Sequence, residues 1–92
     1  MAKNRTARGY ILYKEVTQNP ADVIAGAVNT ESFTVTGVQP DHWIQVMAPS
    51  LEAGLVLCQA WCDVANTVKV RIANPTVNPI TTASQVFYFM IR

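Results

Sequence analysis

The stretch Gly54–Asn74, GLVLCQAWCDVANTVKVRIAN, decides the fold, because it reads as two strands joined by a short polar turn. From Thr67 to Ile72, apolar and polar residues alternate with the two-residue period of a strand that has one buried and one wet face. Residues 55–62 are apolar on both faces, so we expect that strand to be covered on both sides. Between them, residues 63–66 supply Asp and Asn, which favour turns. The stretch therefore predicts a β-hairpin.

Outward from this hairpin, five more segments carry strand patterns bounded by turn residues. They are Gly9–Val16, Asp22–Val28, Glu31–Val38, His42–Ala48 and Gln85–Arg92. The second of these could also be a short helix, although its glycine disfavours that alternative. The last is apolar on both faces, so we expect it at the centre of a sheet or under a partner. The pattern predicts an all-β fold, a small β-sandwich or barrel of about seven short antiparallel strands.

Two further segments are predicted to lie outside the sheets. The run that follows Asn74 holds two prolines within five residues, which excludes a central strand and favours an extended connector. Residues 1–8, MAKNRTAR, are basic and aperiodic, and we expect a flexible N-terminal arm ahead of a single β-domain of residues 9–92. The arm is either a solubilising tail or a segment that orders against a neighbouring subunit or an acidic surface.

Composition limits the classes of function. Half of the residues are hydrophobic, and only 14% are charged against a usual share of about 25%. This deficit predicts that some surface is buried against copies of the chain or another protein, although Thr, Asn, Gln and Ser could instead coat it. A net charge of +1 argues against nucleic acid as a partner. No run is long enough to span a membrane and no signal peptide is evident, so we expect synthesis in a cytoplasm.

The residues that carry enzyme chemistry are few and scattered. The chain has one histidine, His42, which we expect at a turn on the surface, and its four glycines lie too far apart to cradle a phosphate. Cys58 and Cys62 would stand about 13 Å apart on a strand, too far for a disulfide, and we expect buried free thiols. We therefore predict no enzymatic activity, no metal and no cofactor.

Aromatic and basic side chains are the candidates for partner binding. Aromatic faces could stack on sugars or nucleic acid, but at strand spacing they more often fill cores or subunit interfaces. Lys69 and Arg71 lie on the polar side of their strand, where we expect a solvated edge that discourages pairing between sheets. The predicted partner-binding residues are Lys3, Arg5, Arg8, Tyr10, Trp43 and Trp61.

Several turn-and-strand signals between residues 31 and 92 resemble those of a known family. The signals are Thr34-Val35-Thr36-Gly37-Val38, then Leu51-Glu52-Ala53-Gly54-Leu55, then Asn66-Thr67-Val68-Lys69-Val70-Arg71-Ile72 leading to Asn74-Pro75-Thr76, with a final strand at the carboxyl end. In this pattern the chain resembles small all-β structural proteins of tailed phages, in particular capsid decoration (cement) proteins.

The resemblance implies a non-enzymatic virion protein on the outer surface of a phage capsid. It would bind the major capsid protein and itself, as a homo-oligomer and most often a trimer, and would stabilise the shell. Two alternatives remain open at this point. One is a tail, collar or fibre component, and the other is a carbohydrate-binding module that adheres to the host.

Overall fold

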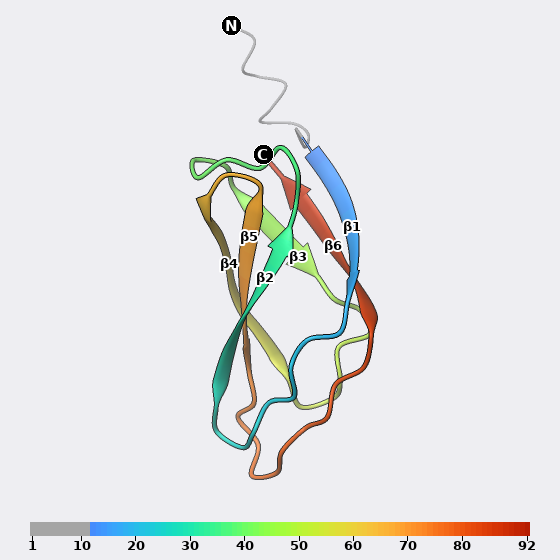
Figure 1. The fold of residues 1–92 in the computed structure, drawn as a ribbon. Helices are drawn as coiled ribbons and strands as arrows, with labels where there is room; N and C mark the ends of the chain where they lie inside the picture. The colour runs from blue at the N-terminus through green and yellow to red at the C-terminus, as the bar shows by residue number, and fades with distance from the viewer. Residues whose placement is uncertain (1–11) are drawn as a thin grey trace, which may run out of the picture.

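Six antiparallel strands and no helix make up residues 12–92, the part of the chain that this computed structural model describes (Figure 1). The strands are β1 (Leu12–Gln18), β2 (Val28–Thr34), β3 (Ile44–Met47), β4 (Val56–Val64), β5 (Thr67–Ala73) and β6 (Gln85–Ile91). They form two three-stranded sheets, ordered β1-β6-β3 and β2-β5-β4. The all-β prediction is confirmed, but the count of seven strands is wrong.

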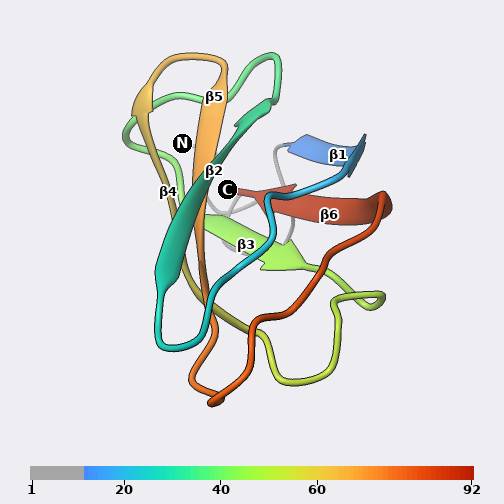
Figure 2. The same cartoon turned by 60° about the horizontal axis from the view of Figure 1, so that its bottom comes forward.

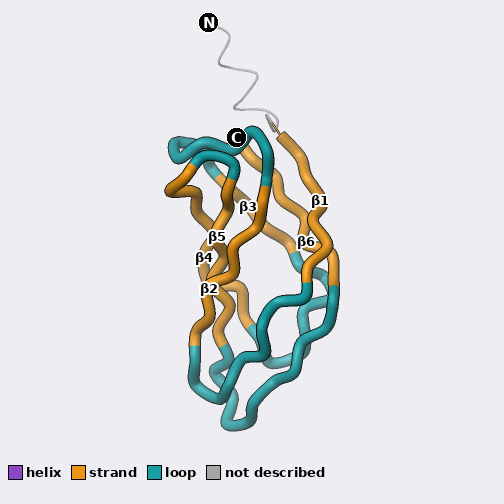
Figure 3. The backbone as a smooth tube through the Cα atoms, viewed as in Figure 1, coloured by secondary structure: helices purple, strands orange, loops and turns teal. Residues whose placement is uncertain are grey.

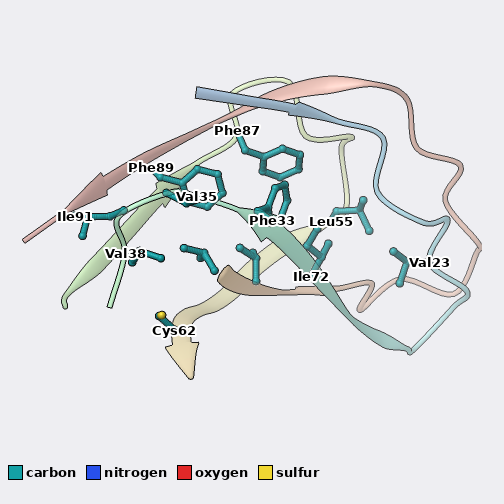
Figure 4. Packing of buried hydrophobic residues seen from close by; sticks show 12 residues of the cluster. Val23, Phe33, Val35, Val38, Leu55, Cys62, Ile72, Phe87, Phe89 and Ile91 are labelled. Carbon is teal, nitrogen blue, oxygen red and sulfur yellow. The ribbon is translucent and has the colours of Figure 1, made fainter. Parts of the chain in front are cut away.

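The hydrophobic core lies between the two sheets, in a sandwich-like arrangement that Figure 2 shows from a second direction. Its centre is a cluster of three rings, with Phe33 of β2 packed 4.7 Å from Phe87 and 5.1 Å from Phe89 of β6, centroid to centroid (Figure 4). All three rings are at most 1% exposed. Tilted aromatic pairs at these separations add to the free energy gained from burying their area. This ring cluster therefore links β2 of one sheet to β6 of the other.

The predicted hairpin is present, since β4 and β5 pair antiparallel around a turn at Ala65 and Asn66. Asn66 has a φ of 69°, the left-handed conformation that asparagine tolerates, and its Oδ1 accepts a hydrogen bond from the Gly37 backbone N–H at 2.8 Å. The apolar face of β5 is fully buried, as predicted. The expectation for β4 is wrong, because β4 is an edge strand with register shifts, and Val56 and Cys58 on it are exposed.

The segment predicted as a strand or helix at residues 22–28 is neither. Val23 pairs in an isolated bridge with Ile80, the chain then turns through Gly26, whose φ is 73°, and only Val28 belongs to a strand, as the first residue of β2. The next predicted strand, 31–38, is displaced towards the N-terminus as β2, because Gly37 adopts a φ of 100° and ends the extended run. The predicted connector after β5 is confirmed as a loop, and Figure 3 shows it among the long connections at one end of the molecule.

The expectations for the cysteines and for the central strands of the two sheets were correct in part. Cys62 is buried as expected, whereas Cys58 is exposed on the edge strand; both thiols are free. The final strand, β6, lies at the centre of its sheet, as predicted. Lys69 and Arg71 do lie on a polar face, but β5 is itself a central strand, so they do not guard a sheet edge. The predicted arm and the predicted domain start at Gly9 lie outside the described residues.

Candidate functional site

The outer face of the β1-β6-β3 sheet carries large apolar side chains although nothing in this chain's described residues covers it. Successive residues of β6 point to opposite sides of the sheet. Phe87, Phe89 and Ile91 enter the core, and so Val86, Tyr88 and Met90 point away from it, each half-buried among its neighbours. The central strand thus gives the outer face an apolar and aromatic floor.

The register of the neighbouring strands places further apolar residues on the same face. Tyr13 of β1 pairs with Met90, and Met47 of β3 pairs with Tyr88. Tyr13 is 51% exposed and Met47 is 50% exposed, so both stand up as walls on either side of the floor. Together with Pro49 these four side chains line an open groove of about 340 Å³. The groove runs along β6 and contains no charged side chain.

Trp43 extends this surface beyond the end of β3. Its backbone N–H donates to the Arg92 carbonyl at 2.6 Å and its carbonyl accepts from the Arg92 N–H at 2.8 Å, which continues the pairing of β3 with β6. The tryptophan is 75% exposed, and with Gln45, Met90 and Arg92 it lines a second, small hollow of about 50 Å³. We call the face formed by Tyr13, Trp43, Met47, Tyr88 and Met90 the aromatic–methionine face.

One carboxylate borders the aromatic–methionine face. The Tyr13 hydroxyl donates a hydrogen bond to Glu15 Oε2 at 3.1 Å, two residues along the same strand. Desolvation of the phenol, together with this hydrogen bond and repulsion by the Glu15 charge, raises the pKa of Tyr13 above its usual value. The hydroxyl therefore stays protonated throughout the neutral range and keeps its hydrogen bond to Glu15 at the rim of the groove.

The outer face of the other sheet has a different character. Trp61 of β4 is half-buried there, with the Arg71 guanidinium carbon 4.9 Å from its ring centroid, and Lys69 Nζ lies 3.2 Å from Asp63 Oδ2. Stacking of this kind contributes about 0.5–1 kcal/mol at exposed sites, and a surface ion pair contributes about 0–1 kcal/mol. This face therefore mixes charged side chains with exposed apolar ones, the latter being Val28, Val56 and Val64.

The predicted partner-binding residues are not brought together as one site. Trp43 lies beside the β1-β6-β3 sheet and Trp61 lies on the outer face of the β2-β5-β4 sheet, on opposite sides of the core, so they cannot form a single stacking platform. Trp43 was expected against the core or a partner, and its exposure of 75% excludes the core. The other four candidates, Lys3, Arg5, Arg8 and Tyr10, lie outside the described residues.

Of the five residues of the aromatic–methionine face, only Trp43 was among the predicted partner-binding residues. The alternation did place Met47 beside Trp43 on one side of a strand, and Tyr88 beside Met90 on one side of another. A single-strand pattern does not reveal which strands are neighbours, and only the pairing of β1 and β3 with β6 assembles the face. The sequence therefore showed which residues share one side of each strand, but it did not show how the strands pair.

The one histidine, for which no catalytic role was expected, has a structural role. His42 Nδ1 accepts a hydrogen bond from the Gln39 backbone N–H at 3.1 Å and so closes a turn. Among residues 12–92, no group of three or more His, Cys, Asp or Glu side chains is placed to hold a metal ion. The same residues include no helix of the length and hydropathy that crossing a membrane requires.

Comparison with protein-family models, with curated proteins and with solved structures gave no match for this chain.

Proposed function

We propose that this chain is a non-enzymatic structural protein whose function is to cover apolar surface on other proteins, and that it decorates the outer surface of a phage capsid as a homo-oligomer, most simply a trimer. One observation carries the proposal: the sandwich of two small sheets leaves Tyr13, Trp43 and Met47 open to solvent on the outer face of one sheet. The proposed location on a capsid is based on the resemblance of the chain's turn and strand signals to those of decoration proteins.

The composition of this face is that of a protein contact. Tyrosine, tryptophan and methionine are enriched at the buried centres of protein interfaces, where charged residues are depleted. Burial of apolar surface yields about 25 cal/mol per Å², so an exposed tryptophan and two half-exposed neighbours represent several kcal/mol that the isolated chain leaves unused. A contiguous patch of this kind on a small protein marks an interaction site.

Binding to assembled shells is the direct test. Empty shells of the major capsid protein from the same genome would be incubated with the chain and sedimented, and bound protein would be measured. We expect saturable binding that Trp43→Glu weakens at least about tenfold, because a tryptophan at the centre of an interface is typically a dominant contributor. Val64→Glu is the matched control, since Val64 is 59% exposed at the β4–β5 turn, away from this face. If the wild-type chain does not bind the shells, the proposed location on the capsid is refuted.

A carbohydrate-binding host-adhesion module is the second candidate, and the exposure of Trp43 favours it. Exposed aromatic rings stack on sugars, and Gln45 and Glu15 could supply polar contacts at the rim. Tryptophan fluorescence would then shift on addition of host polysaccharide, and a flat titration would exclude this candidate. A tail, collar or fibre component would use the same face for protein contact and differ only in location, which labelling of intact virions would distinguish.

A further inference from the structure

A group of oxygen atoms lies at the end of the molecule where the long connections between strands gather. Thr82, in the loop between β5 and β6, contacts residues 19–22 of the connection between β1 and β2, and Figures 1 and 2 both place these two segments side by side. The Thr82 hydroxyl is 3.3 Å from Asn19 Oδ1 and 3.2 Å from Asp22 Oδ1, and it also bonds the Pro20 carbonyl. Thr82 is only 8% exposed. Four oxygen atoms from two distant segments therefore meet in a half-enclosed place.

The single proton of the Thr82 hydroxyl cannot serve three acceptors. It goes to the Pro20 carbonyl, the nearest of the three, because Asp22 Oδ1 already accepts from the Thr82 backbone N–H at 3.0 Å. Among residues 12–92, no other donor reaches Asn19 Oδ1. Asn19 Oδ1 and Asp22 Oδ1 therefore face the lone pairs of the Thr82 oxygen with no proton between them. A bound cation accounts for such a meeting of unpaired acceptors.

The kind and spacing of these oxygens fit calcium. Calcium takes about six to eight carboxylate, carbonyl and water oxygens at about 2.3–2.6 Å, whereas magnesium requires about 2.0–2.1 Å. Two ligands at right angles lie about 3.3 Å apart around an ion at 2.3 Å, and about 3.0 Å apart around an ion at 2.1 Å. The separations of 3.2 and 3.3 Å from Thr82 Oγ1 match the larger ion. Because Asn19 and Asp22 are exposed, water can complete the coordination shell.

The charge at this end of the molecule favours a cation as well. Glu31 Oε2 accepts from the Ala21 backbone N–H at 3.1 Å, and Glu52 Oε2 accepts from the Ala83 backbone N–H at 2.9 Å, so two more carboxylates flank the oxygen group. The three connections at this end contain no lysine, arginine or histidine; they are residues 19–27, 48–55 and 74–84. Carboxylates that no nearby basic side chain compensates raise the local concentration of cations.

We propose that Asn19 Oδ1, the Asp22 carboxylate and Thr82 Oγ1 bind one calcium ion, with the Pro20 carbonyl holding the hydroxyl proton away from it. The ion joins two loops whose residues are 60 positions apart. One carboxylate among neutral ligands makes a weak site, with a dissociation constant of about 0.1–1 mM. The expectation of no metal considered only groups of His, Cys and acids, and this site holds a single acid. It does not depend on the proposed function.

Thermal unfolding of the full chain tests the site. Samples would contain EDTA, about 10 mM calcium, or magnesium or sodium chloride at matched ionic strength. We expect calcium to raise the wild-type midpoint by at least about 4 °C, and either other salt to raise it by less than half as much. Asp22→Asn keeps an acceptor for the Thr82 N–H but removes the charge, and it should abolish the calcium shift. Asn19→Asp adds a carboxylate and should tighten calcium binding several-fold in calorimetry.

Glu52→Gln is the matched control, because it removes a carboxylate at the same end but outside the oxygen group. Its calcium shift, measured against its own EDTA sample, should equal that of the wild type. The inference is overturned if calcium leaves the wild-type midpoint unchanged, as it would if the Asn19 amide were turned to donate its Nδ2 hydrogen to Thr82. It is also overturned if Asp22→Asn keeps the shift, if Glu52→Gln loses it, or if the other salts act equally. None of these outcomes bears on shell binding.

Discussion

The side-chain amide of Asn74 donates a hydrogen bond to the backbone carbonyl of Val23 at 2.9 Å, joining two loops that are 51 residues apart in the sequence. The same Nδ2 bonds the Asn78 carbonyl at 2.8 Å, and Asn74 is 1% exposed. Its Oδ1 accepts hydrogen bonds from the Thr76 backbone N–H at 3.0 Å and the Thr76 hydroxyl at 2.6 Å, so every polar atom of this side chain has a partner. The arrangement fixes the loop that presents Val77, and it depends on asparagine having both a donor and an acceptor.

Replacing Asn74 with aspartate should destabilise the fold strongly. Asn74→Asp would set a carboxylate oxygen against two carbonyl oxygens, and both would lose their donor in a buried site. We expect the free energy of unfolding to fall by at least about 2 kcal/mol, measured by urea denaturation. Asn29→Asp is the matched control, because Asn29 Nδ2 also donates to a carbonyl, that of Asp22 at 3.0 Å, but in a more exposed place. Equal losses for the two variants would contradict this interpretation.

Gly54 and Gly26 separate the steric and conformational effects of adding a methyl group. Both have positive φ values, 96° and 73°, so alanine is strained at either position. A Cβ at Gly54 would also lie 3.0 Å from Ile80 Cδ1 and 3.2 Å from Thr76 Cγ2, whereas one at Gly26 would meet nothing within 4 Å. We expect Gly26→Ala to cost about 1 kcal/mol and Gly54→Ala to cost about 1–3 kcal/mol more. Thermal denaturation that ranks them in the reverse order would refute the packing account.

The phenol of Tyr13 should titrate above the usual tyrosine pKa of about 10. As the pH rises through that value the unfolded chain loses its proton first, so Tyr13 favours folding below about pH 10 and this contribution disappears above it. Glu15→Gln removes the carboxylate charge while desolvation remains, and it should bring the pKa of Tyr13 part of the way down. The NMR signal of the Tyr13 ζ-carbon, followed during a pH titration, measures both values separately from the other two tyrosines. An unchanged pKa in Glu15→Gln would remove the carboxylate as a cause.

Local patterns in the sequence were sufficient to predict the strands and turns whose own residues determine their conformation. Alternation in β5 identified its buried face correctly, the apolar run of β6 indicated a strand at the centre of a sheet, and Asp and Asn marked the hairpin turn. Errors arose where conformation is decided by neighbours. Residues 22–28 have strand composition but turn at Gly26 to meet Asn74, and β4 looks buried on both faces but lies at a sheet edge, where Val56 is exposed.

The candidate site was predictable only in its parts. Trp43 was singled out as a partner-binding residue, and the structure leaves it exposed, although the sequence could not exclude a place in the core. The groove depends on Tyr13 and Met47 flanking β6, a relationship between residues at least 34 positions apart that no local period encodes. Low charge indicated that some surface would be covered, and the register determines which surface that is.

Quenching of Trp43 by acrylamide tests most directly whether the aromatic–methionine face is covered by protein. Trp61→Phe leaves Trp43 as the sole tryptophan, and its fluorescence would be recorded for the dilute chain and for the shell-bound chain. We predict that the free chain is readily quenched, as expected for a side chain that is 75% exposed, and that binding reduces the quenching several-fold with a blue shift. Equal quenching of Trp43 in the free and bound states would contradict the account.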